Sequence, residues 1–206
     1  MIGLAAGAMI AAAALAVLPL QPAVAVALSQ PVSAEPAGWR DALISHLQPG
    51  DVVFRRGIGD ISEAIAAMQG FVRRQSTTWS HVGVVTQIRP DGPLYIVHAI
   101  DRGVVLETPT QFFGLTEASA GTRIQGNKTT EAAAQAATRY LGRSFDDDFS
   151  LSDNGERMYC TELFVVAMRD AGASVKIEPR KVLMISDPVI MPDDLFAALE
   201  TLLPKN

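Results

Sequence analysis

The chain has 206 residues, of which 49% are hydrophobic and 19% are charged. With 22 acidic and 17 basic side chains it has a formal net charge of -5 and a sequence pI near 5.2. This composition excludes a disordered chain and predicts one folded domain with a sizeable core. No run of Lys or Arg is longer than a pair, so the sequence offers no broad phosphate-binding surface, and we expect no nucleic-acid partner.

The N-terminal segment is strongly apolar. The first charged residue is Glu35, and residues 1–20 contain no polar side chain. We interpret residues 1–27 as an export signal, because Ala23-Val24-Ala25 and Ala25-Val26-Ala27 both fit the pattern of a cleavage site. An apolar run of this length could also span a bilayer as an uncleaved anchor. We therefore expect an exported, periplasmic or extracellular protein, with a linker at residues 28–37 and a folded domain at residues 38–206.

Helical spacing and turn residues organise the first part of the domain. The segment Trp39 to Leu47 is predicted to form a short helix that ends before Pro49-Gly50. The next apolar segment, Asp51 to Arg55, reads as a strand. Apolar residues recur with helical spacing from Ile61 to Val72, which predicts a second helix.

The clearest strand pattern lies in the middle of the chain. The segments His81 to Ile88 and Leu94 to Ile100 are rich in Val and Ile, and they flank Arg89 to Pro93, which has the residues of a hairpin turn. Gly103 to Glu107 is predicted to be the third strand and Thr122 to Gln125 the fourth. Because the hairpin strands are apolar on both faces, we expect both sides of the sheet to be covered.

The last third of the chain is mainly helical by its pattern. Thr130 is expected to cap a helix from Glu131 to Leu141, and a polar loop leads to a second helix from Cys160 to Ala171. Lys181 to Ile185 is predicted to add a strand, and Pro192 begins a final helix that runs to about Leu203. The predicted fold class is therefore α+β, with a central antiparallel sheet packed by helices.

Cys160 is the only cysteine, so the chain forms no internal disulfide. A lone cysteine is either a small buried core residue or a nucleophile. Its predicted place at the start of a helix favours the nucleophile, because the helix dipole stabilises a thiolate there. The free backbone N–H groups of the same helix end, including that of Cys160, could bind a substrate oxyanion.

Two of the three histidines lie on the predicted hairpin. If residues whose numbers add to an odd value such as 181 are paired, then His81 and His98 share one face at a diagonal. An even sum would place them on opposite faces. In the first case His81 would be the base for Cys160 and His98 would orient it. The alternative is that each is a core histidine bonded to the backbone. His46, before a Pro-Gly turn, is expected to be structural or exposed.

The sequence contains few of the motifs that are typical of metal sites, phosphate-binding sites or serine hydrolases. The chain has no C-x-x-C or H-E-x-x-H motif for zinc, and no glycine-rich phosphate loop or G-x-S-x-G elbow. An EF-hand beginning at Asp148 fails, because its glycine position is Asp153 and its closing glutamate position is Tyr159. Acidic loops alone do not distinguish a glycosidase acid from a base. We expect no metal and no organic cofactor.

Four segments in this order resemble the permuted papain-like hydrolases of the NlpC superfamily, specifically the YiiX-like group. The segments are Pro49-Gly50-Asp51-Val52-Val53-Phe54, Trp79-Ser80-His81-Val82-Gly83-Val84-Val85, Tyr95-Ile96-Val97-His98-Ala99 and Tyr159-Cys160-Thr161-Glu162-Leu163. In ordinary NlpC enzymes the cysteine helix precedes the histidine strand, whereas here it follows, as in the permuted branch. The resemblance spans roughly Leu47 to Leu203.

The resemblance implies a circularly permuted papain-like fold with Cys160 as nucleophile, His81 as base and His98 as the third polar residue. Many YiiX-like members carry Glu at this third position, whereas lecithin:retinol acyltransferase relatives use His. Glu162 matches the family's Cys-Ser/Thr-Glu pattern and would act behind the nucleophile or as a helix cap. Tyr159 would either bond near the oxyanion or pack as a ring, and Ser80 is expected beside the base.

These features lead to three functional hypotheses. The first is a cysteine hydrolase of amidase or peptidase type whose substrates are cell-wall peptides or related amides. The second keeps the site but acts on a lipid ester or acyl chain. The third is a binding module whose thiol is inert. A long apolar groove would favour lipid, and a polar cleft with a carboxylate would favour peptide.

Overall fold

The structure is a computed structural model that describes residues 38–57, 63, 65, 67, 69, 79–114, 118–153, 155–182 and 185–203. The predicted export signal and linker lie outside the described residues, as does most of the helix predicted from Ile61 to Val72. The four described residues of that segment, 63, 65, 67 and 69, are helical. Across the described ranges, no helix is both long enough and apolar enough to cross a membrane.

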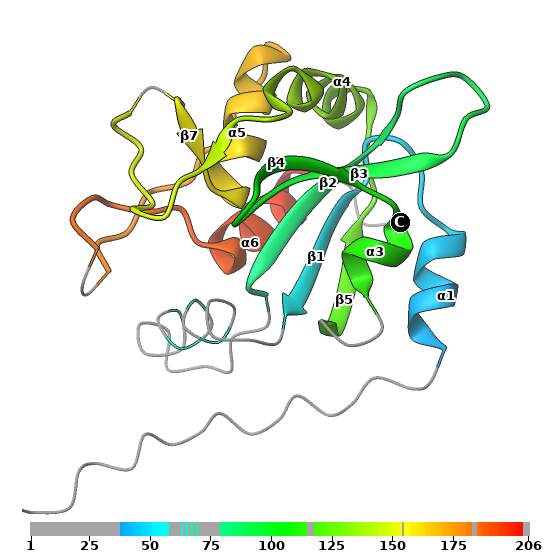
Figure 1. Ribbon diagram of the computed structural model, residues 1–206, viewed down its shortest axis with the longest axis horizontal. Coiled ribbons are helices and arrows are strands. Elements are labelled where there is room, and N and C mark those ends of the chain that lie inside the picture. Colours follow the sequence, from blue (N-terminus) through cyan, green and yellow to red (C-terminus); the bar gives the residue numbers. More distant parts are fainter. Residues whose placement is uncertain are drawn as a thin grey trace, which may run out of the picture.

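A five-stranded antiparallel sheet forms the centre of the protein, in the order β4-β3-β2-β1-β5 (Figure 1). The strands are β1 Val52–Gly57, β2 His81–Gln87, β3 Leu94–Ile100, β4 Gly103–Glu107 and β5 Ala118–Ile124. The hairpin and the third strand form as predicted. The fourth predicted strand also forms, as β5, and it lies beside β1 at the opposite edge from β4.

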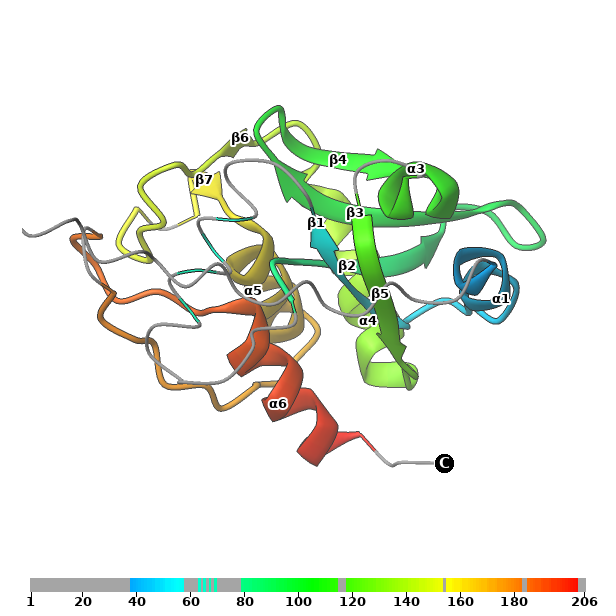
Figure 2. The same ribbon diagram turned by 90° about the horizontal axis from the view of Figure 1, so that it is seen from below.

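Helices cover both faces of this sheet, as the apolar strands predicted (Figures 1 and 2). On one face lie α4 Lys128–Ala137, α5 Cys160–Asp170 and α6 Pro192–Leu202, which share a large apolar core with alternate strand residues such as Val82, Val84 and Val97. On the other face, α1 Trp39–Ser45 and α3 Pro109–Phe113 pack with the intervening residues such as Val85 and Ile96. The period-two alternation of strand side chains thus builds two separate cores.

Several local predictions need correction. The cap of α4 is Asn127, whose side chain accepts hydrogen bonds from the N–H groups of Thr129 and Thr130. Thr130 lies three residues into the motif and completes a capping box by accepting from the N–H of Asn127. The helix therefore starts earlier than predicted, and after Ala137 it tightens into the 3-10 turn η1 Thr138–Tyr140.

The strand predicted from Lys181 to Ile185 is wrong for its described residues. The only pairing there is an isolated bridge between Arg180 and Val189. Two apolar residues of this region, Val182 and Val189, are instead buried in a small cluster with Met191. The apolar residues of this segment thus correctly indicated that it is buried. They did not indicate a strand, because the described residues of the segment pair with a neighbour only at the one bridge.

Two further elements had no counterpart in the sequence prediction. The helix α3 begins at Pro109 and is capped by Thr108, which forms a reciprocal capping box with Gln111. The polar loop before Cys160 contains the short parallel pair β6 Ser144–Phe145 and β7 Arg157–Met158. Elements this short give too little periodicity to be recognised, although the Thr-Pro-x-Gln cap was a usable signal.

A buried carboxylate ties β1 to the end of β5. Asp51 is 1% exposed, and its Oδ2 accepts hydrogen bonds from Gln48 N at 3.0 Å and Arg123 Nη1 at 2.9 Å. Its Oδ1 accepts from Gly126 N at 2.8 Å. The backbone at Gly126 approaches so closely that a Cβ there would lie 2.2 Å from Gly50 O. The carboxylate therefore joins three chain segments where no side chain could fill the gap.

Candidate active site

Four adjacent strands each contribute one polar side chain to the same face of the sheet. In the β2–β3 pair Val84 lies opposite Val97, so paired residue numbers add to 181 and His81 and His98 fall on one face. Their rings meet directly, with 2.8 Å between His81 Nε2 and His98 Nδ1. The prediction that the two histidines share a face and touch is therefore confirmed.

The outer members of this row are Arg55 and Glu107, which the sequence analysis missed. Arg55 is the direct cross-strand partner of His81 on β1. On β4, Val105 is the partner of His98, and Glu107, two residues further, lies diagonally across from it. The Oε2 atom of Glu107 is 3.1 Å from His98 Nε2. The same pairing arithmetic that placed the histidines, extended to β4, would have found Glu107.

Helix α3 covers the row through one aromatic ring. The ring of Phe112 lies 5.6 Å from the ring of His81 and 5.0 Å from that of His98, measured between centroids. Arg55 Nη1 donates a hydrogen bond of 2.6 Å to Phe112 O, and its guanidinium lies 4.9 Å from the ring centroid. Phe112 is fully buried, so it excludes water from the bonds between the polar groups.

Burial and neighbouring charges keep both imidazoles neutral. Burial, then Arg55, then His98 lower the pKa of His81 well below its usual 6.5. Burial also lowers the pKa of His98, although Glu107 opposes this. The contact with His98 lowers the pKa of Glu107, so this carboxylate is ionised at neutral pH. The row therefore contains a guanidinium, two neutral imidazoles and a carboxylate.

Cys160 approaches the start of β2 from the other face of the sheet. It is the first residue of α5, is 7% exposed, and belongs to the core that contains Val82. The backbone N–H of Val82, the residue after His81, lies close enough to lower the pKa of its thiol. The structure thus places the sulfur against the backbone of β2 beside His81, whereas the imidazole of His81 projects on the α3 face.

The expectation that the helix start lowers the pKa of the thiol is corrected by its burial. Burial raises the pKa of Cys160 from 9.0 to about 11, and this outweighs the lowering by the backbone N–H groups of Val82, Thr161 and Cys160 itself. The helix end contributes in the expected direction, but desolvation of a thiolate is the larger effect. The resting site therefore holds a neutral thiol and a neutral imidazole.

We expect slow alkylation of Cys160 by iodoacetamide in the resting protein. A pKa near 11 in place of 9.0 leaves ~100-fold less thiolate at pH 8, because each unit of pKa changes this fraction tenfold. The rate should keep rising with pH up to about 11. The measurement is the alkylation rate between pH 6 and pH 11 by intact-protein mass spectrometry, with glutathione as reference. A plateau already reached below about pH 8 would contradict a buried neutral thiol.

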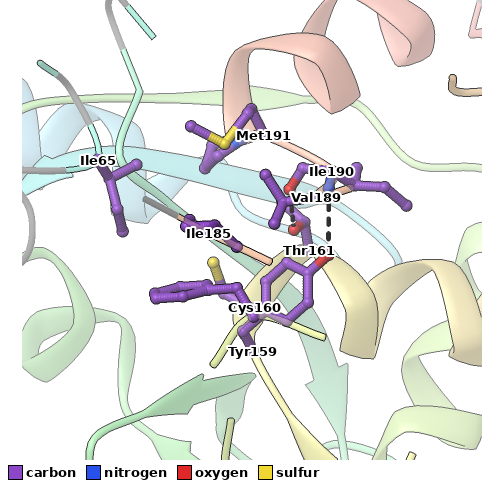
Figure 3. A pocket seen from close by; sticks show the side chains of 10 residues that line it. Ile65, Tyr159, Cys160, Thr161, Ile185, Val189, Ile190 and Met191 are labelled. Carbon is purple, nitrogen blue, oxygen red and sulfur yellow. Dashed lines mark hydrogen bonds between the residues drawn. The ribbon is translucent and has the colours of Figure 1, made fainter. Parts of the chain in front are cut away.

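A pocket opens beside the sulfur of Cys160 (Figure 3). Its empty space is about 290 Å³, including the part that opens to solvent. None of the described side chains that line it is charged, and its walls include Ile65, Phe149, Ile185, Val189 and Met191. The part of this space that the centre of a water-sized sphere can occupy is only about 20 Å³, so the apolar pocket is a narrow one.

Tyr159 and Thr161, which flank the cysteine, hold one wall of this pocket. The Tyr159 hydroxyl accepts a hydrogen bond of 3.1 Å from Ile190 N, and Thr161 Oγ1 donates one of 2.6 Å to Ile190 O (Figure 3). The backbone N–H and the backbone carbonyl of Ile190 are therefore both hydrogen-bonded to residues at the beginning of α5. Of the two roles considered for Tyr159, the structure shows a packed and bonded ring that positions Ile190.

The other residues singled out by the sequence occupy supporting positions. Ser80 is buried, and its Oγ accepts a hydrogen bond of 3.0 Å from Gly57 N, which ties β1 to the residue before His81. Glu162 is 4% exposed; burial, with a smaller contribution from Asp153, raises its pKa to about 8, although the N–H of Tyr159 acts in the opposite direction. Glu162 lies in the first turn of α5, and its role as a helix cap stays a prediction. His46 ends α1 and its Nδ1 lies 2.7 Å from Ala42 O.

The acidic loop before Cys160 is organised by one arginine. Among the described residues, the acidic or ligand-type groups that lie close enough together to hold a metal ion are Asp146, Asp147 and Asp148. Arg157 forms ion pairs with all three, at 3.4, 3.0 and 2.8 Å. Because the guanidinium already supplies the positive charge, this cluster does not fit a resident metal.

The antiparallel sheet, the helices on both faces, and a cysteine helix that follows the histidine strand define a permuted papain-like α+β protein. The family model described as "Permuted papain-like amidase enzyme, YaeF/YiiX, C92 family" matches residues 46–189. The chain belongs to this family.

The chain is also similar to two individual proteins. The chain is 32% identical over 123 residues to the uncharacterized protein YiiX of Escherichia coli (strain K12), a match that covers 56% of this chain and 54% of the relative. The matched region therefore spans about half the length of that relative. The crystal structure titled "metalloprotein yiiX" from Escherichia coli O157:H7 is similar in fold, with a TM-score of 0.57 and 22% identity over 72% of this chain and 91% of that one.

Proposed function

We propose that this protein is an exported cysteine amidase in which Cys160 is the nucleophile, His81 the base and His98 the residue that orients His81. The observation that carries the proposal is the position of the thiol. It lies at the start of α5 and is acted on by the N–H of Val82, the residue that follows His81, whose imidazole is itself held by a second imidazole. A nucleophile, a base and a third polar group are the components that thiol catalysis requires.

The neutral resting state determines how such a reaction begins. As the sulfur attacks the amide carbon, its proton passes to Nδ1 of His81, so the S–C bond forms without a standing thiolate. The C–N bond then breaks, and His81 returns the proton to the leaving amine. Water hydrolyses the resulting thioester, and the free thiol is restored.

The helix start also supplies groups for the oxyanion. The N–H groups of Cys160 and Thr161 belong to the first turn of α5, where they have no partner within the helix. Both lie close to the sulfur, since both lower the pKa of the thiol. Donors fixed in this way stabilise the negative charge on the tetrahedral intermediate without any reorganisation.

The apolar pocket limits the substrate. Its side chains are those that would contact the acyl part of a substrate bonded to Cys160, and none of the described ones offers a carboxylate for an amine. The apolar lining favours an aliphatic group, and the narrow space favours a small one, such as the side chain of a small amino acid. We therefore place short cell-wall peptides first as substrates. The apolar lining also favours the second candidate, a lipid acyl group, but the compact volume opposes a long chain.

No metal takes part in the proposed chemistry. The similar crystal structure from Escherichia coli O157:H7 is described as that of a metalloprotein. In this chain the described carboxylates that could gather around a cation are paired with Arg157, and His81 and His98 are bonded to each other. The proposed steps therefore use protein groups and water alone.

The test is turnover of two kinds of amide by the full chain, with Cys160→Ala as the matched control. One set is 4-nitroanilides of aliphatic acids from acetyl to palmitoyl, and the other is peptides released from purified cell wall, read out as new amino groups. We expect hydrolysis with a preference for short aliphatic acyl groups, and a loss of at least about 1,000-fold in the variant. Mass spectrometry of the quenched wild type should find the acyl group on Cys160.

Other outcomes separate the hypotheses. A preference that rises steadily to palmitoyl would favour the lipid acyl hydrolase over the peptide amidase. Equal rates for the wild type and Cys160→Ala would reject both and favour a binding module with an inert thiol.

A further inference from the structure

Glu107 lies at the end of a buried row of polar side chains in close contact that leads to His81. Its side chain is 17% exposed, and its Oε2 atom is 3.1 Å from Nε2 of the fully buried His98. The other nitrogen of His98, Nδ1, is 2.8 Å from Nε2 of His81. Three side chains from three successive strands are therefore connected atom to atom, although neither His81 nor Cys160 touches Glu107.

The direction of the protons in this row follows from the chemistry of its end. An ionised carboxylate only accepts hydrogen bonds, so Nε2 of His98 must carry the proton. In a neutral imidazole the other nitrogen then has a lone pair, so Nδ1 of His98 accepts from Nε2–H of His81. His81 is neutral as well, which leaves a lone pair on its own Nδ1.

That lone pair is on the nitrogen a base would need. Nδ1 is the ring nitrogen closest to the backbone of β2, and the N–H of Val82 on the same backbone contacts the Cys160 thiol. With the opposite tautomer, Nδ1 of His81 would carry a hydrogen and could not accept the proton of the thiol. One acceptor at the far end of the row thus decides whether His81 is competent as a base.

We infer that Glu107 is a positioning residue that acts through His98 to hold His81 in the tautomer with an unprotonated Nδ1. This role rests on the proposed function for its catalytic consequence, whereas the tautomer itself is a property of the resting protein. The carboxylate also faces the imidazolium that forms when His81 takes the proton, and its charge stabilises that state through His98.

Two cations also act on this row. Arg102 Nη2 lies 3.2 Å from Glu107 Oε1, with its side chain 70% exposed, and Arg55 lies on β1 across from His81. Both oppose protonation of His98. Among the described charged groups that act on the pKa of His98, loss of the Glu107 charge would leave two cations, so protonation would require a lower pH.

The first test is ¹⁵N NMR of the full chain labelled at histidine, which has only three such residues. The ring nitrogens report directly whether each carries a hydrogen, and exposed His46 serves as an internal reference. In the wild type, Nε2 of His81 and His98 should be the protonated nitrogens. In Glu107→Ala we expect the reversed tautomer to reach a comparable population, because the acceptor is gone. Glu107→Gln keeps an acceptor oxygen, so it should retain the wild-type tautomer.

The second test is kinetic and uses Arg102→Ala as the matched control. Glu107→Ala should lower kcat about 10- to 100-fold, the range for a lost hydrogen bond to a charged group, with KM within about twofold. The acid limb of kcat/KM should move to lower pH in both Glu107 variants. Arg102→Ala removes the exposed ion pair but leaves the contact with His98, so its kcat should stay within about twofold.

The two tests keep this inference separate from the proposed function. Unchanged tautomers in Glu107→Ala would overturn the positioning role, whatever the activity. Tautomers that shift as expected, in a protein whose hydrolysis does not depend on Cys160, would overturn the proposed function and the catalytic part of the role with it. A kcat loss of equal size in Glu107→Ala and Arg102→Ala would reduce Glu107 to a structural ion pair.

Discussion

Replacing His81 by Gln is expected to lower kcat/KM for amide hydrolysis by about 1,000-fold, within the range contributed by a general base. The resting thiol has a pKa of about 11, so almost none of it is ionised at neutral pH. Attack therefore depends on a base that removes the proton during the reaction, and Gln offers no such nitrogen. Because Gln is similar in size and remains polar, the packing against Phe112 should be preserved.

The chain provides a matched control for this experiment. His46 lies at the exposed end of α1, and its ring nitrogen Nδ1 contacts Ser45 and Ala42 of the same helix end. His46→Gln should leave kcat/KM within about twofold of the wild type, as expected for a surface change. The measurement is the initial rate with the best substrate of the panel. A loss below about tenfold for a folded His81→Gln would rule out His81 as the base.

Replacing Asp51 by Ala is expected to lower the free energy of unfolding by about 3 to 5 kcal/mol, as is typical when one partner of a buried ion pair is removed. The carboxylate is 1% exposed and accepts from Arg123, Gln48 and Gly126. Without it, two backbone N–H groups and a half-buried guanidinium lose their acceptor. The neighbouring backbone has no room to move inward, because Gly126 already lies against Gly50.

Urea denaturation monitored by circular dichroism would measure this loss, with Asp147→Ala as control. Asp147 is 82% exposed and is one of several carboxylates around Arg157, so its removal should cost less than about 0.5 kcal/mol. Asp51→Asn keeps an acceptor oxygen and should give an intermediate loss. A change below about 1 kcal/mol for Asp51→Ala would show that the chain segments at Gly50 and Gly126 are held by packing alone.

Much of the sheet could be predicted because its signals are local. The Val- and Ile-rich segments around the turn at Arg89 to Pro93 give the hairpin, and Leu94–Ile100 and Gly103–Glu107 form with the predicted bounds. Apolar residues on both faces predicted coverage of both faces, which α1 and α3 on one side and α4, α5 and α6 on the other provide. The residue pattern of a strand can be recognised from the sequence of that strand alone, without knowledge of its neighbours.

The candidate site was predictable only in part. His81 and His98 were placed together by pairing arithmetic, since their hairpin is formed by residues close in sequence. Glu107 was missed because its contact depends on a second register, that of β3 with β4. Arg55 was missed for a similar reason, because β1 and β2 are joined by a long segment and their pairing follows from no local turn.

The sequence by itself determined most of the longer elements, their order and the residue types of a thiol site, because propensity, turn chemistry and periodicity act over short distances along the chain. Only the tertiary structure decided the electrostatic state of that site. The start of α5 favours a thiolate, but burial of Cys160 raises its pKa, and desolvation depends on segments that are distant in sequence. The compact pocket beside the sulfur has the same origin, since its walls come from separate parts of the chain that meet only in the folded protein.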